Sequence, residues 1–248
     1  WIERIKIFFS KYDLSAQGEQ ETIPFQGDRN HPFIITLTLT EEEITRIKAY
    51  ARERGATLND AMLAAYVRIL HKKTGWRRIV VPCPVDLRRY IPPDTPHGIC
   101  NLTGNYICDI VMDETDVFED TLEKVSDQLK SQKASSNCLK PVMTLELLSH
   151  IVPFHTMHAQ FSKVYTVPII SYTNLGILDD DLLVLGDLSV AEAFITGTIK
   201  YAPYFQLSIS TYRQRCILTS NMYGTKEDKQ FIEQFLADVK NELMSDTA

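Results

Sequence analysis

The alternation of apolar and polar residues predicts that strands and helices follow one another along most of the chain. An alternating run at 31–39 indicates a strand, and Thr40–Glu43 has the spacing of a capping box, which predicts a helix over 41–54. A second capping box begins at Thr57. Apolar residues cover much of the circumference of the helix that follows it, through about Lys72, so we expect this helix to be buried.

The same reading extends to the C-terminal half of the chain. It predicts helices over 116–133 and 141–148, a strand over 166–177, short strands within 182–199, a hairpin of 205–212 with 214–221, and a last helix capped by Thr225 and Asp228. This order of elements predicts an α/β (α+β) lobe with an open mixed sheet and helices packed mainly on one side.

The stretch from residue 79 to residue 106 brings polar groups to the ends of two apolar strands. Ile79–Val81 reads as a buried strand, which we expect to break at Pro82 and Pro84 because proline cannot donate a hydrogen bond to a sheet ladder. The polar turn Asp86–Arg88 follows, and Gly104–Tyr106 starts the next strand. This arrangement predicts a crevice beside the strand ends.

Composition narrows the class of protein. With 248 residues, of which 44% are hydrophobic and 23% charged, the chain can form one large or two small globular domains. A net charge of −6 argues against a nucleic-acid partner, although a local basic patch could still bind coenzyme A. The sequence shows no run long enough to span a membrane and no signal peptide, and its five cysteines suit reduced thiols, so we expect a cytoplasmic protein.

The first thirty residues differ from the rest in composition. Residues 1–30 decay into a stretch typical of linkers, and we expect them to be a tail that arrives from an upstream lobe, with the lobe itself over 31–248. The chain begins at Trp1 without methionine, which suggests a fragment or a processed product.

The pair His155 and His158 has a spacing that invites a metal interpretation. Zinc needs three or four ligands, and the helical E-x-x-H context of such sites is absent here. We therefore expect ordinary loop or surface histidines and no metal site.

Three short motifs resemble one family of enzymes. They are PVDLR at 84–88 with GNY at 104–106, TLNDAMLAAYVRIL at 57–70, and PIISYTNLG at 168–176. In this order they are similar to the second half of the chloramphenicol acetyltransferase-like superfamily, which includes the condensation domains of nonribosomal peptide synthetases, alcohol acetyltransferases and polyketide-associated acyltransferases. The resemblance covers roughly residues 31–245.

The resemblance implies a chloramphenicol acetyltransferase-like lobe of a two-lobed enzyme with its active site between the lobes. Such enzymes move an acyl group from a coenzyme A or carrier-protein thioester to a small-molecule alcohol or amine, and no cofactor is bound covalently. Their general base is the second histidine of H-H-x-x-x-D-G in the first lobe. This sequence lacks that motif, and the strand end 219–225, at the matching place, holds neither His nor Asp. We expect no catalytic residue here and an inactive chain when it is alone.

The resemblance also implies roles for particular residues. Arg88 would pair with the aspartate of the missing motif across the lobe interface, unless it forms a pair within the lobe with Asp86. The residues expected to line the channel are Asn105, Ser171, Thr173 and Asn174. For the hydroxyl groups, the alternative is a core strand whose side chains are satisfied by neighbouring carbonyls.

Two functions of different classes stay open. The first is the C-terminal lobe of an acyltransferase or condensation-type enzyme, which would need an N-terminal lobe or self-association to cover its channel side. The second is a non-catalytic binding or scaffolding module with the same fold. A serine hydrolase is disfavoured because G-x-S-x-G is absent.

Overall fold

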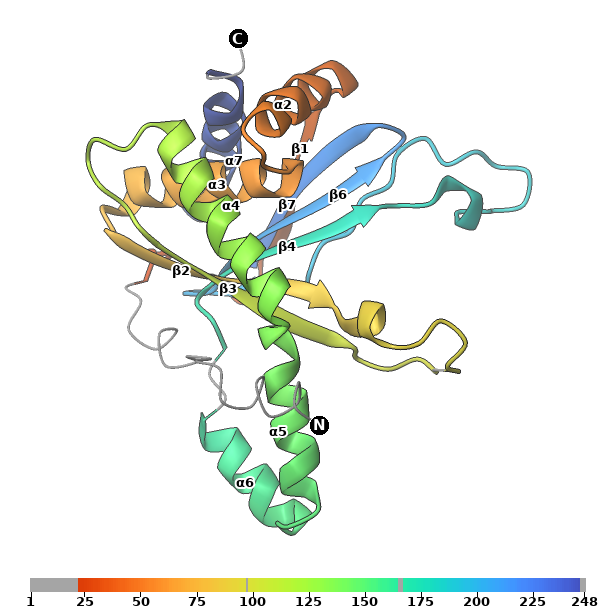
Figure 1. The fold of residues 1–248 in the computed structure, drawn as a ribbon. Helices are drawn as coiled ribbons and strands as arrows, with labels where there is room; N and C mark the ends of the chain where they lie inside the picture. The colour runs from red at the N-terminus through yellow and green to blue at the C-terminus, as the bar shows by residue number, and fades with distance from the viewer. Residues whose placement is uncertain (1–21, 97, 165–166, 246–248) are drawn as a thin grey trace.

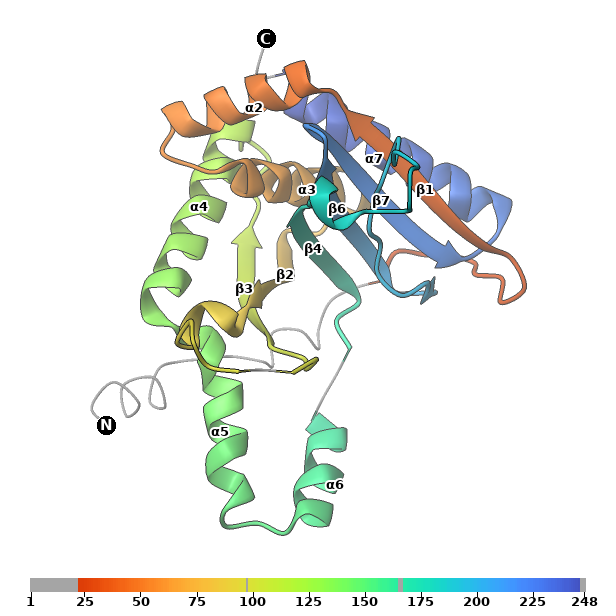
Figure 2. The same cartoon turned by 90° about the vertical axis from the view of Figure 1, so that its right-hand side faces the viewer.

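The computed structural model describes residues 22–96, 98–164 and 167–245, and it shows helices on one side of a layer of strands (Figures 1 and 2). In chain order the elements are β1 (Pro32–Leu39), α2 (Glu41–Glu53), α3 (Leu58–Thr74), β2 (Arg78–Asp86), η2 (Leu87–Tyr90), β3 (Thr103–Val111), α4 (Phe118–Ser135), η3 (Asn137–Leu139), α5 (Lys140–Ser149), α6 (Phe154–Val164), β4 (Ile170–Ile177), η4 (Asp180–Leu182), β5 (Lys200–Tyr201), β6 (Phe205–Tyr212), β7 (Arg215–Tyr223) and α7 (Lys226–Ser245). The predicted fold class is confirmed.

The strands form two hydrogen-bonded ladders in one layer. The first has the order β1-β7-β6-β4, with β5 also paired to β7, and the second joins β2 to β3. Strand β4 runs parallel to β6, whereas β1 and β6 run antiparallel to β7, which makes the sheet mixed. Strand β2 lies beside β4 (Figure 2), but the ladder is interrupted between them.

The prediction that Pro82 and Pro84 end a strand is wrong, because β2 continues through both to Asp86. Pro82 is opposite Ile107 of β3, and the backbone groups of Ile107 bind a side chain of α4 instead of β2. Positions in an antiparallel pair alternate between bonded and non-bonded, so Pro82 and Pro84 are both at non-bonded positions toward β3. Their ring nitrogens face β4, which is where the ladder is interrupted.

Helix α4 covers the free edge of β3. Gln128 and Gln132 each accept a hydrogen bond from a β3 backbone N–H, from Asp109 at 2.8 Å and from Ile107 at 2.7 Å, and each donates to the carbonyl of the same residue. Four helical residues rise about 6.0 Å, close to the roughly 6.6 Å of two strand residues. The side chains of α4 thus act as a neighbouring strand and block this edge against further pairing.

The core lies between the strand layer and α3. Tyr66, in the middle of α3, is fully buried, and its ring centroid lies 6.1 Å from those of Tyr172 and Phe205 and 5.8 Å from that of Phe235. Its hydroxyl donates to the carbonyl of Ser171 at 3.2 Å, so the buried polar group is satisfied. The buried helix predicted from the sequence is confirmed.

A cluster of charges joins α3, α7 and the start of α4. Arg68 Nε lies 2.5 Å from Glu242 Oε1, and its Nη1 donates to the carbonyl of Asp116 at 2.8 Å. Lys72 binds the second carboxylate oxygen of Glu242. Burial alone would raise the pKa of Glu242, but the hydrogen bonds from Lys72 and Arg68 outweigh it and lower that pKa. The Glu242 carboxylate therefore joins α7 to α3, and Arg68 extends the link to the residues just before α4.

Residues 22–30, within the predicted linker, pack against the lobe. Ile23 is buried in the core, and the ring of Phe25 meets that of Phe231 edge-on at 5.5 Å. The backbone N–H groups of Gln26 and Gly27 donate to the Asp228 carboxylate at 3.0 and 2.9 Å. Residues 1–21 lie outside the described residues, and the origin of the tail in an upstream lobe stays a prediction.

The prediction of short strands over 182–199 is wrong. The structure has a single bridge there, between Leu185 and Leu188, and the segment near 195 lies over the face of the sheet opposite the helices. Ile195 N–H donates to Ser210 Oγ at 3.2 Å, and Asn221 Nδ2 donates to the Gly197 carbonyl at 2.6 Å. The segment stays irregular because side chains of β6 and β7, and no strand, satisfy its backbone.

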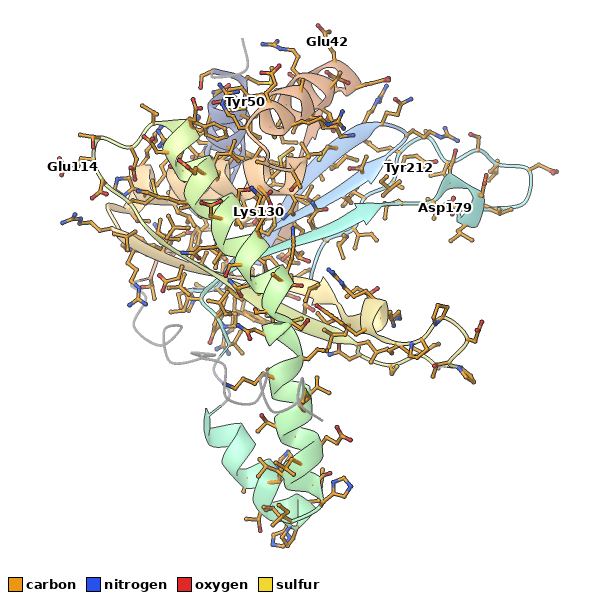
Figure 3. All side chains as sticks on the ribbon, viewed as in Figure 1. Glu42, Tyr50, Glu114, Lys130, Asp179 and Tyr212 are labelled. Atoms are coloured by element: carbon orange, nitrogen blue, oxygen red, sulfur yellow. The ribbon has the colours of Figure 1, made fainter. Side chains whose placement is uncertain are left out.

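One residue anchors the beginning of this segment. Tyr212, labelled in Figure 3 at the end of β6, has its hydroxyl oxygen 2.5 Å from Asp180 Oδ1 and 2.8 Å from the Val190 carbonyl oxygen, so both acceptors share its one proton. Between these anchors the chain exposes apolar side chains to solvent.

Helices α5 and α6 form a hairpin that projects from the lobe (Figures 1 and 2). None of the residues of α5 is buried. At the tip, Ile151 is 72% exposed and Phe154 is 75% exposed, which marks an apolar surface.

Candidate functional site

The polar residues singled out from the sequence gather at one end of the strand layer. Strands β2, β4 and β6 all run toward this end (Figure 1). Asp86 is the last residue of β2, and Asn105 of β3 is opposite Pro84. Asn174 lies near the end of β4. We call this region the strand end.

Asp86 and Arg88 form a pair within the lobe. Asp86 Oδ1 accepts hydrogen bonds from the Arg88 backbone N–H at 2.9 Å and from its Nη1 at 3.2 Å, and Nη2 donates to the Cys100 carbonyl at 3.3 Å. The side chains are 62% and 43% exposed, so water screens this pair. The guanidinium is thereby held at the surface, and its pairing with another lobe stays a prediction.

Asn174 is oriented by a neighbour that the sequence analysis did not assign to the site. Its Nδ2 donates to Asn59 Oδ1 at 3.0 Å, and its Oδ1 accepts the Gly176 N–H at 3.0 Å. Gly176 has φ of 73°, a left-handed conformation that favours glycine. Asn59 belongs to TLND and Asn174 to TNLG, so the fold joins two motifs that are far apart in the sequence. The one signal in the sequence for this role of Asn59 is the polar pair Asn59-Asp60 that follows the N-cap of α3.

The other predicted channel residues lie on the opposite face. Alternation along β4 places Ser171 and Thr173 on the face away from the helices, because Tyr172 between them packs against α3. Asn105 is on the same outer face, but β2 separates its strand from β4. All three are half-buried. Ser171 Oγ meets the Phe205 carbonyl at 3.5 Å, as the core-strand alternative expects.

The buried thiols near the site are not activated nucleophiles. Burial raises the pKa of Cys83 to about 12, and it also raises the pKa of Cys108. A nucleophilic cysteine needs a lowered pKa. On the same side of the sheet, burial and then a hydrogen bond between Tyr106 and Tyr90 raise the pKa of Tyr106.

The described histidines lie away from the strand end. His31 precedes β1 and binds Asp28 at 2.6 Å, at the opposite end of the sheet, and His71 binds the Trp76 carbonyl at 2.8 Å near the end of α3. The other described histidines are on or beside α5 and α6 and are exposed: His150, His155 and His158. His97 lies outside the described residues, and the position four residues after it is Asn101, not aspartate.

Residues 219–225, at the end of β7, also lie away from the strand end around Arg88 and Asn174. Strand β7 is antiparallel to β6, so its end is at the far end of the sheet from Asn174. Thr219 and Asn221 there are buried and bind the segment near 195. This region contributes nothing to the strand end around Arg88.

Other kinds of site receive no support. Within residues 22–96, 98–164 and 167–245, no group of three or more His, Cys, Asp or Glu side chains could hold a metal ion. No described helix is both long and apolar enough to cross a membrane. Surface hollows of ≈ 390 Å³ between α3 and α7 and of ≈ 440 Å³ beside the start of α7 contain none of the predicted channel residues.

Comparisons with known proteins find similarity in structure and not in sequence. No protein-family model and no curated protein matches the sequence. Among solved structures, trichothecene 15-O-acetyltransferase from Fusarium sporotrichioides aligns with a TM-score of 0.66 at 16% identity, over 92% of this chain and 50% of that one. The epimerization domain from the third module of tyrocidine synthetase B aligns with a TM-score of 0.60 at 12% identity, over 92% and 53%.

A condensation domain gives the same result. The first condensation domain of the CDA synthetase aligns with a TM-score of 0.55 at 12% identity, over 100% of this chain and 50% of that one. The chain spans about half the length of each of these structures. It therefore has the fold shared by condensation domains and chloramphenicol acetyltransferase-like acyltransferases.

Proposed function

We propose that this chain is the C-terminal lobe of an acyltransferase or condensation-type enzyme. The enzyme would move an acyl group from a coenzyme A or carrier-protein thioester to an alcohol or amine. An N-terminal lobe bearing H-H-x-x-x-D-G would supply the histidine that takes the proton from the attacking hydroxyl or amine. The cytoplasm, where acyl-coenzyme A is available, is the compartment this proposal expects.

The observation that carries the proposal is a polar strand end without a described histidine. Arg88 and Asn174 are fixed there by hydrogen bonds to Asp86 and Asn59. These groups can bind and orient, but none of them is a general base for an alcohol at neutral pH. A site that orients without a base fits one half of a divided active site.

Exposed apolar surface supports the need for a covering lobe. Besides the tip of the α5–α6 hairpin, the segment after β4 exposes Ile177 at 82%, Leu182 at 80% and Leu188 at 74%. Several large apolar side chains exposed along one segment are typical of an interaction site. It lies on parts of the chain that project from the helix-and-sheet layers (Figure 1).

The proposal is tested by thiol release from acetyl-coenzyme A with a panel of alcohols and amines. Residues 1–248 alone should give no turnover above background, and the same chain joined to a lobe bearing H-H-x-x-x-D-G should release thiol. Replacing the second histidine of that motif with alanine, as the control, should abolish the release.

Two results would separate the alternatives. Robust turnover by residues 1–248 alone would overturn the argument from the missing base. A two-lobed protein that assembles but transfers no acyl group, from coenzyme A or from a carrier protein, would favour the non-catalytic binding or scaffolding module.

A further inference from the structure

Strand β1 forms one edge of the sheet (Figure 2), so half of its backbone groups point away from β7. The register identifies which half. The two-residue turn of the β6–β7 hairpin makes Tyr212 and Arg215 a hydrogen-bonded pair, and bonded and non-bonded pairs alternate from there along β7. Ile34, Thr36 and Thr38 are opposite β7 residues whose backbone groups bind β6. Their own N–H and C=O groups therefore face outward.

This edge is open. Within the part of the chain that the structure describes, no hydrogen bond reaches the outward groups of Ile34, Thr36 or Thr38. No residue of β1 is charged, and Ile34 is 47% exposed. The opposite edge of the layer, β3, is blocked by Gln128 and Gln132.

The contrast between the two edges calls for an explanation. Proteins usually protect an exposed edge strand with charge, proline, a bulge or a covering element, because an open edge is a template for pairing. Here one edge is covered by a row of side chains, whereas the other has uncharged Ile and Thr at its outward positions. An edge left in this state suits a strand that pairs in the assembled protein.

We propose that β1 is a docking strand at which two copies of this chain pair antiparallel about a twofold axis centred on Thr36. Thr36 then faces Thr36 of the second copy, and Ile34 faces Thr38. In this register every outward N–H and C=O of the three residues gains a partner. The two β-sheets become one continuous sheet across the axis.

The ends of β1 limit this ladder to the same three residues. Pro32, the next outward position on one side, has no N–H to donate. Thr40, the next on the other side, already donates its N–H to the Glu43 carboxylate at 2.8 Å. Ile34, Thr36 and Thr38, the three residues that pair in the proposed dimer, are therefore the outward positions of β1 whose N–H and C=O groups can both form new hydrogen bonds.

A second copy of this chain suits the β1 edge better than a different protein of opposite net charge does. An antiparallel strand is its own complement about a twofold axis, which is the commonest symmetry of protein dimers. Facing threonines form a favourable cross-strand pair, and no like charges meet within the strand. The net charge of −6 on each chain opposes association at a distance, so we expect pairing to strengthen as salt is added. The proposal does not depend on acyl transfer.

The test is sedimentation equilibrium of residues 1–248 over a wide concentration range, with two variants of one residue. The unaltered chain should show a monomer–dimer equilibrium. Thr36→Pro removes an outward N–H and leaves the bonds to β7, because proline is tolerated where the edge N–H faces solvent. Two hydrogen bonds are lost per dimer, so its dissociation constant should rise about tenfold or more. Thr36→Val keeps the N–H and loses only the facing hydroxyl groups, so it should raise the dissociation constant much less than Thr36→Pro does.

A second measurement needs no variant. Amide hydrogen exchange at Ile34, Thr36 and Thr38 should slow as the concentration of the unaltered chain increases. A chain that stays monomeric throughout overturns the proposal. So does a dimer that Thr36→Pro and Thr36→Val affect equally, as expected if it formed through the α5–α6 hairpin, and so does exchange at β1 that is independent of concentration.

Discussion

Asn59 Oδ1 accepts two hydrogen bonds, one from Asn174 Nδ2 at 3.0 Å and one from Tyr172 Oη at 3.0 Å. A single side chain at the start of α3 thereby fixes the exposed end of β4 and also satisfies a buried phenol. Tyr172 is only 1% exposed, so its hydroxyl has little access to water as a substitute partner. The position of the candidate channel residue Asn174 is tied to the stability of the core.

Asn59→Ala should destabilise the lobe by about 1–3 kcal/mol, because it leaves a buried hydroxyl without a good acceptor. Urea unfolding followed by circular dichroism measures the change. Tyr172→Phe removes the stranded hydroxyl, so Asn59→Ala should cost clearly less in a Tyr172→Phe background. An equal cost in both backgrounds would show that the hydroxyl is not the reason.

The second prediction concerns the carboxylate of Asp228. It accepts hydrogen bonds from the backbone N–H groups of Thr225, Gln26 and Gly27. Burial alone would raise the pKa of Asp228, but these bonds outweigh it and lower the pKa below its usual 3.8. A carboxyl group whose pKa is lowered by folding stabilises the protein above its unfolded pKa, and this contribution is lost as the pH falls through the folded value.

Asp228→Asn should therefore cost about 1–3 kcal/mol at pH 7, and the cost should shrink as the pH is lowered below 3.8, where the parent loses the same contribution. Unfolding free energies between pH 7 and pH 3 measure this. Asp120→Asn is the matched control, because Asp120 accepts one backbone N–H, from Val117, at 2.9 Å. A cost of Asp228→Asn that does not change with pH would contradict the assignment.

Gly104 provides the third prediction. A Cβ added there would lie 2.9 Å from the backbone carbonyl oxygen of Cys138 and 2.8 Å from Leu87 Cδ2. The backbone of η3 cannot yield as a flexible side chain would, so Gly104→Ala should destabilise the lobe by about 1–3 kcal/mol through overpacking. Gly98→Ala, in the preceding loop, is the control because a Cβ there meets nothing within 4 Å. Thermal unfolding with equal midpoints for the two variants would refute this account.

Sequence patterns correctly predict the helix starts, which depend on interactions between residues a few positions apart. The capping boxes at Thr40 and Thr57 form as the spacing predicts, each with both reciprocal hydrogen bonds. The prediction at the prolines of β2 is wrong because the side of a strand that an N–H faces depends on neighbours far along the chain. Gln128 and Gln132 gave no signal for the same reason, since their spacing matches β3 only after the helix lies along it.

The candidate site likewise contains one contact between residues close in the sequence and one between residues far apart in it. Asp86 and Arg88 are two residues apart, and the sequence predicts their pair as one of two alternatives. The link from Asn174 to Asn59 crosses 115 residues, so no pattern within either motif could reveal it. Sequence placed the polar groups at strand ends, and the fold decided which face each of them occupies.

The last prediction separates the two roles open to Arg88. In residues 1–248 alone, Arg88 pairs with Asp86 at 3.2 Å, and both side chains are well exposed, at 43% and 62%. Exposed ion pairs contribute about 0–1 kcal/mol, so Arg88→Ala should leave the unfolding free energy of this chain nearly unchanged. If Arg88 also pairs with the buried aspartate of H-H-x-x-x-D-G in a covering lobe, the same substitution leaves that carboxylate unpaired, which costs about 3–5 kcal/mol.

The cost should appear only in the two-lobed protein, as weaker assembly of the lobes and lower turnover. Titration of one lobe with the other by calorimetry measures assembly, and thiol release measures turnover. Arg89→Ala is the matched control, because Arg89 is the adjacent exposed cation and its guanidinium lies 5.2 Å from the ring centroid of Tyr90. Because the aspartate is to be buried only at the interface, Arg88→Ala must weaken the two-lobed protein far more than it weakens this chain alone. Equal effects in both would assign Arg88 to its pair with Asp86 and nothing beyond it.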